Sequence, residues 1–263
     1  MADTAVVTGA ARGIGRAIAS RLTREGWSVV VADLDADALR ETAAELGALA
    51  VPGDTATEAG VRHLVETAYG HLGHVDAFFA NAGIGTLAGL DAPDAEWARA
   101  LDTNVMAHVR AARLLVPRWL DAGGGRLVVT ASAAGLLTML GDAPYSVSKH
   151  GAVAFAEWLS ASYRHRGIVV QAICPQGVQT RMLEESGPLQ GLLTRDATVT
   201  PDEVADAVWD ALSGDDFLVL PHPEVRDYYA QRAAHPDAWL AGMNRLQQKL
   251  DHQTSTTSTQ EHS

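Results

Sequence analysis

Tyr145 and Lys149 are the two residues whose types and spacing most directly suggest chemistry. Residues four apart on a helix share one face, so a phenol and an ammonium are expected to lie close together. A phenol ordinarily ionises near pH ~10, and a fixed positive charge beside it favours the phenolate and lowers its pKa. The pair could therefore act as a general acid and base near neutral pH. A solvated polar helix face would give the same spacing.

A glycine-rich turn follows the strand-like run Thr4–Thr8 and leads into the helical segment Gly13–Glu25. Glycines allow a tight turn, a close approach of backbone to phosphate, and close packing of helix on strand. The free N–H groups and positive dipole end at the start of the helix suit a pyrophosphate. The pattern predicts a dinucleotide site with contacts from Gly9, Arg12, Gly13, Ile14 and Gly15.

Asp33, which follows the second strand-like run, indicates which dinucleotide binds. A carboxylate at this place accepts hydrogen bonds from the adenosine ribose hydroxyls and repels a 2′-phosphate, so it favours NAD over NADP. Two neighbours leave the alternative open: Arg12 could pair with a 2′-phosphate, and Asp35 could be only a helix N-cap.

Seven strand-like runs alternate with helical segments along the chain. The expected strands are Thr4–Thr8, Ser28–Ala32, Ala48–Val51, Val75–Ala80, Arg126–Ala131, Ile168–Ile173 and Phe217–Leu220. The expected helices are Gly13–Glu25, Ala36–Leu46, Glu58–His71, Asp94–Leu120, Ser146–Arg164 and Pro201–Leu212, with a bend near Pro117. Strands joined by such helices pair in parallel, and their apolar character is typical of a sheet covered on both faces. We predict an α/β fold with a doubly wound, parallel, seven-stranded sheet.

No linker divides the chain, so we expect one catalytic domain over residues 1–221, including a substrate loop at 182–197. Residues 222–250 carry aromatic and aliphatic side chains at partly helical spacing. They predict a helical extension that covers the active site or a neighbouring subunit, or packs on its own domain. Residues 251–263 are polar and of low complexity, and we expect them to be disordered.

Composition and charge argue against several classes of function. Of the 263 residues, 47% are hydrophobic and 20% charged, as in ordinary globular proteins. A net charge of −12 without a Lys/Arg run argues against nucleic-acid or membrane partners. One cysteine, Cys174, excludes an intrachain disulfide and a cysteine-based zinc site, and the histidines show no metal-ligand spacing. No signal peptide or ~20-residue apolar run is visible, so a cytoplasmic enzyme without a metal is expected.

Five motifs, in register from about residue 3 to about residue 221, resemble those of the classical short-chain dehydrogenase/reductase family. They are Thr8-Gly9-x-x-x-Gly13-x-Gly15, Asp54 followed by Thr55, Asn81-Ala82-Gly83, Asn104, and Ser132 thirteen residues before Tyr145. The resemblance implies a Rossmann-type fold and an NAD-dependent oxidoreductase that interconverts a secondary alcohol and a ketone. Alternatives are an NADP-dependent carbonyl reductase and, from another class, a non-catalytic dinucleotide-binding sensor.

The resemblance also assigns roles to residues. Tyr145 would be the general acid and base, Lys149 would lower its pKa and bind the nicotinamide ribose, and Ser132 would hold the substrate oxygen. Asn104 would position a water that links Lys149 to solvent. Cofactor contacts are implied for Asp54, Thr55, Asn81, Ala82, Gly83, Tyr145, Lys149, Pro175, Val178 and Thr180.

One departure from the family pattern lies after the sixth strand, where Gln176 and then Gly177 follow Pro175 in place of a Pro-Gly pair. Gln176 could line the substrate pocket or point outward. We expect the pocket to include Ala133, Leu140, Gln176 and Met182. Its leucine-rich surroundings favour an apolar or weakly polar small-molecule alcohol or ketone, although the leucines could instead pack on the protein. The resemblance further implies a homotetramer or homodimer.

Overall fold

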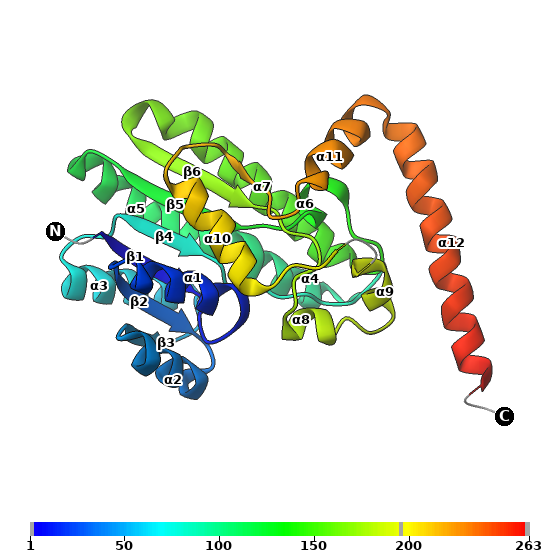
Figure 1. Ribbon diagram of the computed structural model, residues 1–263, viewed down its shortest axis with the longest axis horizontal. Coiled ribbons are helices and arrows are strands. Elements are labelled where there is room, and N and C mark those ends of the chain that lie inside the picture. The colour runs from blue at the N-terminus through cyan, green and yellow to red at the C-terminus, as the bar shows by residue number, and fades with distance from the viewer. Residues whose placement is uncertain (1–2, 195–196, 261–263) are drawn as a thin grey trace.

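The central sheet has seven strands, all parallel, in the order β3-β2-β1-β4-β5-β6-β7 (Figure 1). The computed structural model describes residues 3–194 and 197–260. The strands are β1 (Thr4–Thr8), β2 (Ser28–Asp33), β3 (Leu49–Pro52), β4 (Ala77–Ala80), β5 (Gly125–Thr130), β6 (Ile168–Ile173) and β7 (Leu218–Val219). The chain builds outward from β1 to β3 and then crosses to the other side of β1 for β4. This confirms the predicted doubly wound sheet.

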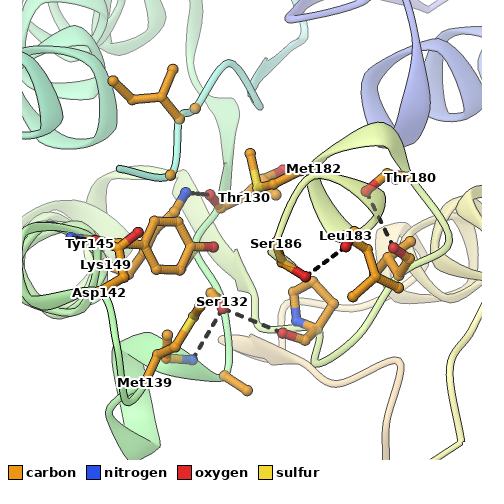
Figure 2. A pocket seen from close by; sticks show the side chains of 18 of the residues that line it. Thr130, Ser132, Met139, Asp142, Tyr145, Lys149, Thr180, Met182, Leu183 and Ser186 are labelled. Carbon is orange, nitrogen blue, oxygen red and sulfur yellow. Dashed lines mark hydrogen bonds between the residues drawn. The ribbon is translucent and has the colours of Figure 1, made fainter. Parts of the chain in front are cut away.

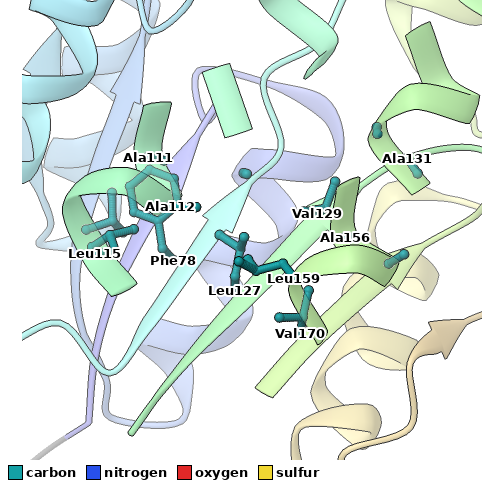
Figure 3. Packing of buried hydrophobic residues seen from close by; sticks show 14 of the residues in the cluster. Phe78, Ala111, Ala112, Leu115, Leu127, Val129, Ala131, Ala156, Leu159 and Val170 are labelled. Atoms are coloured by element: carbon teal, nitrogen blue, oxygen red, sulfur yellow. The ribbon is translucent and has the colours of Figure 1, made fainter. Parts of the chain in front are cut away.

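Helices cover both faces of the sheet. They are α1 (Gly13–Arg24), α2 (Ala36–Leu46) and α10 (Pro201–Leu212) on one face, with α3 (Glu58–Leu72), α5 (Ala107–Ala122) and α7 (Ala143–Tyr163) on the other. Successive side chains of a strand point to opposite faces of the sheet, so the protein has two hydrophobic cores. Ala5 and Val7 of β1 pack in the first core, beneath α1, α2 and α10. Val6 packs in the second core, beneath α3, α5 and α7. Figure 3 shows the second core, where Phe78 and Leu127 of the sheet lie between α5 and α7.

The long helix predicted over Asp94–Leu120 is interrupted. It consists of α4 (Asp94–Leu101), a π-helical turn (Asp102–Met106) and α5, which continues through Pro117 to Ala122. A π turn is a local change from i→i+4 to i→i+5 hydrogen bonding within a helix, and the prediction assumed one regular helix. Such turns concentrate at functional sites, and this one contains Asn104.

Short helices surround the expected substrate region. They are α6 (Ala134–Leu137), α8 (Arg181–Glu184), the 3₁₀ turn Gly187–Leu189 and α9 (Gln190–Leu193). In the predicted substrate loop, residues 195 and 196 lie outside the described part. Beyond β7 the chain forms α11 (Glu224–Ala234) and α12 (Pro236–Gln260), and α12 runs along one side of the molecule (Figure 1).

The helix α12 continues through Gln260, although residues 251–263 were expected to be disordered. No glycine or proline follows Gly242 to end the helix, and serine and threonine are only moderately poor helix formers. Disorder of this tail in solution stays a prediction. Residues 261–263 lie outside the described residues.

Trp119 tests the packing of the second core. Its side chain is fully buried, and Nε1 donates a hydrogen bond to the Val75 carbonyl at 2.6 Å. Trp119→Ala should lower the free energy of unfolding by about 3–5 kcal/mol because it leaves a large cavity. Leu90→Ala, at a side chain that is 96% exposed, is the control and should change it little. Urea unfolding followed by circular dichroism measures both, and equal losses would contradict this packing.

Candidate active site

A cleft of about 1990 Å³ lies along the carboxyl ends of the strands. Its lining includes Gly9 after β1, Asn81 after β4, Ser132 after β5 and Pro175 after β6. The strand order reverses between β1 and β4, and open parallel sheets bind ligands at such a point. The fold thus brings together residues that are far apart in the sequence.

Almost every residue singled out in the sequence lines this cleft. On the expected cofactor side these are Gly9, Arg12, Gly13, Ile14, Asp33, Asp54, Thr55, Asn81, Ala82, Gly83, Pro175, Val178 and Thr180. Ser132, Tyr145 and Lys149 line it too, as do Ala133, Leu140, Gln176 and Met182. Gly15 and Asn104 are not among the lining residues.

The glycine turn is shaped by close approaches of backbone. Gly9 has a φ of +65°, and a Cβ added there would lie 2.8 Å from the Ala82 Cα. A Cβ at Gly15 would lie 2.2 Å from the Gly9 carbonyl oxygen, so Gly15 serves the packing of α1 on the turn and not the cleft directly. The first turn of α1 has no side-chain cap, which leaves N–H donors for a phosphate. The turn fits a dinucleotide pyrophosphate.

The charges near the end of β2 are arranged in a small network. The Asp33 carboxylate accepts hydrogen bonds from the backbone N–H groups of Ala11 and Asp35, each at 3.0 Å. Asp35 caps α2 by accepting from the Ala38 N–H at 3.2 Å, and it forms an ion pair with Arg12. The Ala38 N–H and then the Arg12 guanidinium lower the pKa of Asp35. Arg12 is thus engaged with a carboxylate of the chain itself.

Asn81 joins three strands at the edge of the cleft. Its Nδ2 donates to the Thr8 carbonyl at 3.0 Å, and its Oδ1 accepts from the Thr130 hydroxyl at 3.0 Å. The Thr8 hydroxyl accepts from the backbone N–H groups of Asn81 and Ala82. These bonds connect the ends of β1, β4 and β5, which carry the glycine turn and Ser132.

Asp142, which the sequence analysis did not single out, places the helix that carries Tyr145. This carboxylate is 1% exposed and caps α7 by accepting from the Tyr145 N–H at 3.0 Å. It also accepts from the N–H groups of Thr86 at 2.8 Å and Leu87 at 2.7 Å. An aspartate just before a helix whose first turn contains Pro144 is a recognisable N-cap signal.

Lys149 lies one turn after Tyr145 on α7 and is 3% exposed. Its Nζ donates to the Thr130 carbonyl at 2.9 Å and lies 5.6 Å from the centroid of the Tyr145 ring. Figure 2 shows the Tyr145 ring reaching into the cavity between this bond and Ser132. A Cβ on Gly83 would lie 3.1 Å from Nζ, so a larger residue there would crowd the ammonium. Burial lowers the pKa of Lys149 to about 8.

The Ser132 hydroxyl is held at the bottom of the cleft. It accepts from the Ala134 N–H at 3.0 Å and donates to the Pro175 carbonyl at 3.5 Å. The nearby Ser132 side chain lowers the pKa of the Tyr145 phenol. A serine hydroxyl and a tyrosine phenol therefore meet at one point of the cleft wall.

Burial shifts the pKa of Tyr145 in the direction opposite to the one expected from Lys149, whose own effect on the phenol stays a prediction. Burial raises the pKa of Tyr145 above its ordinary value, and this effect exceeds that of the Ser132 side chain. Lys149 is not among the causes of the shift.

Asn104 is fully buried in the π turn, and its side chain is engaged in the protein. Its amide donates to the Ile84 carbonyl and the Ser148 hydroxyl and accepts from the Ile84 N–H, each at 2.9 Å. Asn104 therefore ties the segment after β4 to α7. A water held by Asn104 next to Lys149 stays a prediction.

His108 is a second residue that the sequence analysis missed. It lies four residues after Asn104 and is 1% exposed. Burial, and next the positive charge of Lys149, lower its pKa to about 3, whereas a hydrogen bond to the Asn104 backbone raises it. The ring is therefore neutral at physiological pH. The spacing of four from Asn104 was the available signal.

Comparisons with known proteins identify the family of the chain. Residues 3–190 match the family model described as short chain dehydrogenase. The chain is 38% identical over 238 residues to a 1-deoxy-11-beta-hydroxypentalenate dehydrogenase of Streptomyces avermitilis, covering 85% of this chain and 86% of the relative. It is 32% identical over 232 residues to a cyclohexanol dehydrogenase of Acinetobacter sp., covering 85% and 92%.

A solved structure gives the same result. A short chain dehydrogenase/reductase from Burkholderia phymatum in complex with NAD superposes with a TM-score of 0.83 at 29% identity, covering 91% of this chain and 95% of that one. The chain belongs to the short-chain dehydrogenase/reductase family, whose members are oxidoreductases that bind a nicotinamide dinucleotide, and it has the fold of that family.

No helix among residues 3–194 and 197–260 is both long and apolar enough to cross a bilayer. Nor does this part of the chain gather three or more His, Cys, Asp or Glu side chains in a group that could hold a metal ion.

The shifted pKa of Lys149 is directly measurable. The chain has two lysines, Lys149 and Lys249, so protein labelled with ¹³C-lysine gives two resolvable side-chain signals. One should titrate near pH 8, in place of the ordinary 10.5, because burial disfavours the ammonium. Lys149→Arg identifies that signal by removing it. If the signal removed by this variant titrated near 10.5, the buried position of the ammonium would be wrong.

Proposed function

We propose that this protein is an NAD-dependent oxidoreductase that interconverts a secondary alcohol and a ketone, with Tyr145 as the general acid and base. The observation that carries the proposal is the meeting of Ser132, Tyr145 and Lys149 in the cleft that the glycine turn also lines. A non-catalytic sensor would not require this set of side chains.

The proton chemistry follows from the placement of these groups. The phenol of Tyr145 removes the hydroxyl proton during oxidation and returns it during reduction. The Ser132 hydroxyl binds the substrate oxygen and shares the charge that develops on it. Lys149 supplies a positive charge near the Tyr145 ring. Its remaining N–H donors can bind a ribose hydroxyl. The nicotinamide, when bound, supplies hydride transfer.

Replacement of the phenol separates catalysis from binding. Tyr145→Phe should lower alcohol-dependent NADH formation by about 10²–10⁴-fold because the acid-base group is lost. The Kd for NADH, measured by fluorescence titration, should stay close to that of the wild type. Unchanged turnover with intact binding would rule out the acid-base role, and it is also the result that a non-catalytic module predicts.

The preference for NAD over NADP rests on Asp33. Its carboxylate lines the cleft just beyond β2, where the 2′-hydroxyl of an adenosine ribose is expected. Arg12, the group that could neutralise a 2′-phosphate, is paired with Asp35 instead. An NADP-dependent carbonyl reductase is the alternative, and it would require Arg12 to leave Asp35.

Asp33→Ser should narrow the preference for NADH over NADPH by about tenfold or more, which corresponds to ~1.4 kcal/mol. The change removes the negative charge that repels the 2′-phosphate. Asp37→Ser, at an exposed aspartate in the first turn of α2, is the matched control and should leave the preference unchanged. Competitive titration of both cofactors measures the ratio. A wild type that bound NADPH more tightly would support the alternative.

The substrate side of the cleft favours a bulky, apolar alcohol. Met139, Leu140 and Met182 line it from the catalytic domain. Opposite them, α12 contributes Trp239, Met243 and Leu246, which are spaced as one helix face. The C-terminal extension is therefore a wall of the cleft. Gln176 also lines it, in support of the expectation that its side chain meets the substrate.

Ring-shaped secondary alcohols fit this lining best. The dehydrogenases similar to this chain are named for a hydroxypentalenate and for cyclohexanol. A panel that ranges from cyclohexanol to polycyclic alcohols, with linear alcohols of equal carbon number as controls, should give the highest kcat/KM with the polycyclic members. Equal rates on linear alcohols would argue against the role of α12.

We also propose assembly as a homodimer or homotetramer through α7. Trp158 is 60% exposed and Val147 is 51% exposed on this helix. Such side chains on one helix provide an apolar surface for a symmetric partner.

A further inference from the structure

His222 is a buried histidine outside the catalytic set, on the segment between β7 and α11. It is 2% exposed. β7 lies beside β6 in the sheet, so residues that follow β7 can reach the loop that follows β6. That loop begins with Pro175 and Gln176, where the sequence departs from the family pattern.

The imidazole contacts the backbone at this departure. The Gln176 N–H donates to the His222 Nδ1 at 3.1 Å. An acceptor at Nδ1 fixes the neutral ring with its proton on Nε2. Nε2 is buried and has no hydrogen-bond partner among the described residues. A buried donor without a partner costs about 1–3 kcal/mol. The bond from the Gln176 N–H is therefore the hydrogen bond that the structure gives to this ring.

The same peptide group reaches the catalytic serine on its other side. The N–H of Gln176 and the carbonyl of Pro175 belong to one planar peptide. The carbonyl accepts from the Ala133 N–H at 2.8 Å and from the Ser132 hydroxyl at 3.5 Å. Rotation of this peptide plane would therefore move the Gln176 N–H and the Pro175 carbonyl together. A bond to the N–H also polarises the carbonyl and strengthens it as an acceptor.

The next residues of the loop are held differently. The Val199 N–H donates to the Gly177 carbonyl at 3.1 Å, and the Gln179 N–H donates to the Val199 carbonyl at 2.9 Å. Backbone bonds to the segment before α10 thus fix the loop from Gly177 onward. The start of the loop is held from the other side, by the bond between the Gln176 N–H and the His222 side chain.

We propose that His222 is a positioning residue for the reaction: through the Pro175–Gln176 peptide it orients the Ser132 hydroxyl and sets the face that Gln176 presents to the substrate. The inference rests on the proposed function. It predicts a larger effect on turnover and substrate KM than on cofactor affinity, because Pro175 is one expected cofactor contact in this set, whereas Asp33 and the glycine turn lie outside it.

Two substitutions separate positioning from packing. His222→Leu fills space but offers no acceptor, whereas the amide oxygen of His222→Asn can take the place of Nδ1. We expect kcat to fall by about 10- to 100-fold in the leucine variant, the range that a displaced catalytic group produces. The asparagine variant should recover most of it. His63→Leu, at an exposed histidine of α3, is the matched control and should keep wild-type kcat.

Further measurements test whether His222 acts on the reaction through the Pro175–Gln176 peptide. In the full-length protein, amide exchange at Gln176, followed by NMR, should speed up in His222→Leu and return toward wild type in His222→Asn. The NADH Kd should stay within about twofold in both. Combining His222→Leu with Ser132→Ala should give no loss in kcat beyond that of Ser132→Ala alone, as expected for residues that act as a unit.

The outcomes distinguish this inference from the proposed function. Equal losses of melting temperature in both variants with unchanged kcat would make His222 a packing residue and overturn the inference. So would unaltered Gln176 exchange in His222→Leu. If the wild-type protein oxidised no alcohol, the proposed function would fail first, and Gln176 exchange would still decide whether His222 holds the peptide.

Discussion

The hydrogen bond from the Lys149 ammonium to the Thr130 carbonyl is the contact on which the geometry of the site depends. It joins α7 to the carboxyl end of β5, and so it brings Tyr145, one turn earlier on α7, to Ser132, two residues beyond Thr130. Gly83 lies beside the ammonium, where an added Cβ would come within 3.1 Å of Nζ. Burial has a cost, seen in the fall of the Lys149 pKa to about 8. Since the unfolded chain holds this proton up to about 10.5, the destabilisation is full below pH 8 and disappears as the pH rises toward 10.5.

Polar side chains around this bond hold the cofactor end and the acid-base end of the site in fixed positions relative to each other. Asn81 connects the strand that carries the glycine turn with the strand that leads to Ser132. Asp142 fixes the start of α7, and Asn104 ties that helix to the segment after β4. Each of these side chains has several partners, so each is satisfied although little solvent reaches it. The cofactor end and the acid-base end of the cleft are thereby parts of one network.

Much of this arrangement could be predicted from the sequence. The parallel sheet follows from apolar runs separated by helices, and the cleft residues follow from motifs such as Asn81-Ala82-Gly83 that lie at strand ends. Interactions that depend on tertiary contacts could not be predicted. The π turn around Asn104 was not predicted, because the expectation of one regular helix over Asp94–Leu120 did not include a change of hydrogen-bond pattern. The higher pKa of Tyr145 reflects burial, and the bond from Gln176 to His222 crosses between the loops after β6 and β7.

Direct hydride transfer within the Ser132–Tyr145–Lys149 cleft is the central claim, and isotope tracing tests it most directly. The wild-type protein would be incubated with NAD⁺ and a ring-shaped secondary alcohol that carries deuterium on its carbinol carbon. The nicotinamide ring of the NADH formed would then be analysed by NMR. The account predicts deuterium at C4 of that ring, on one face only, and a slower rate than with the unlabelled alcohol. Deuterium released to water, or no reduced cofactor from any alcohol of the panel, would contradict it.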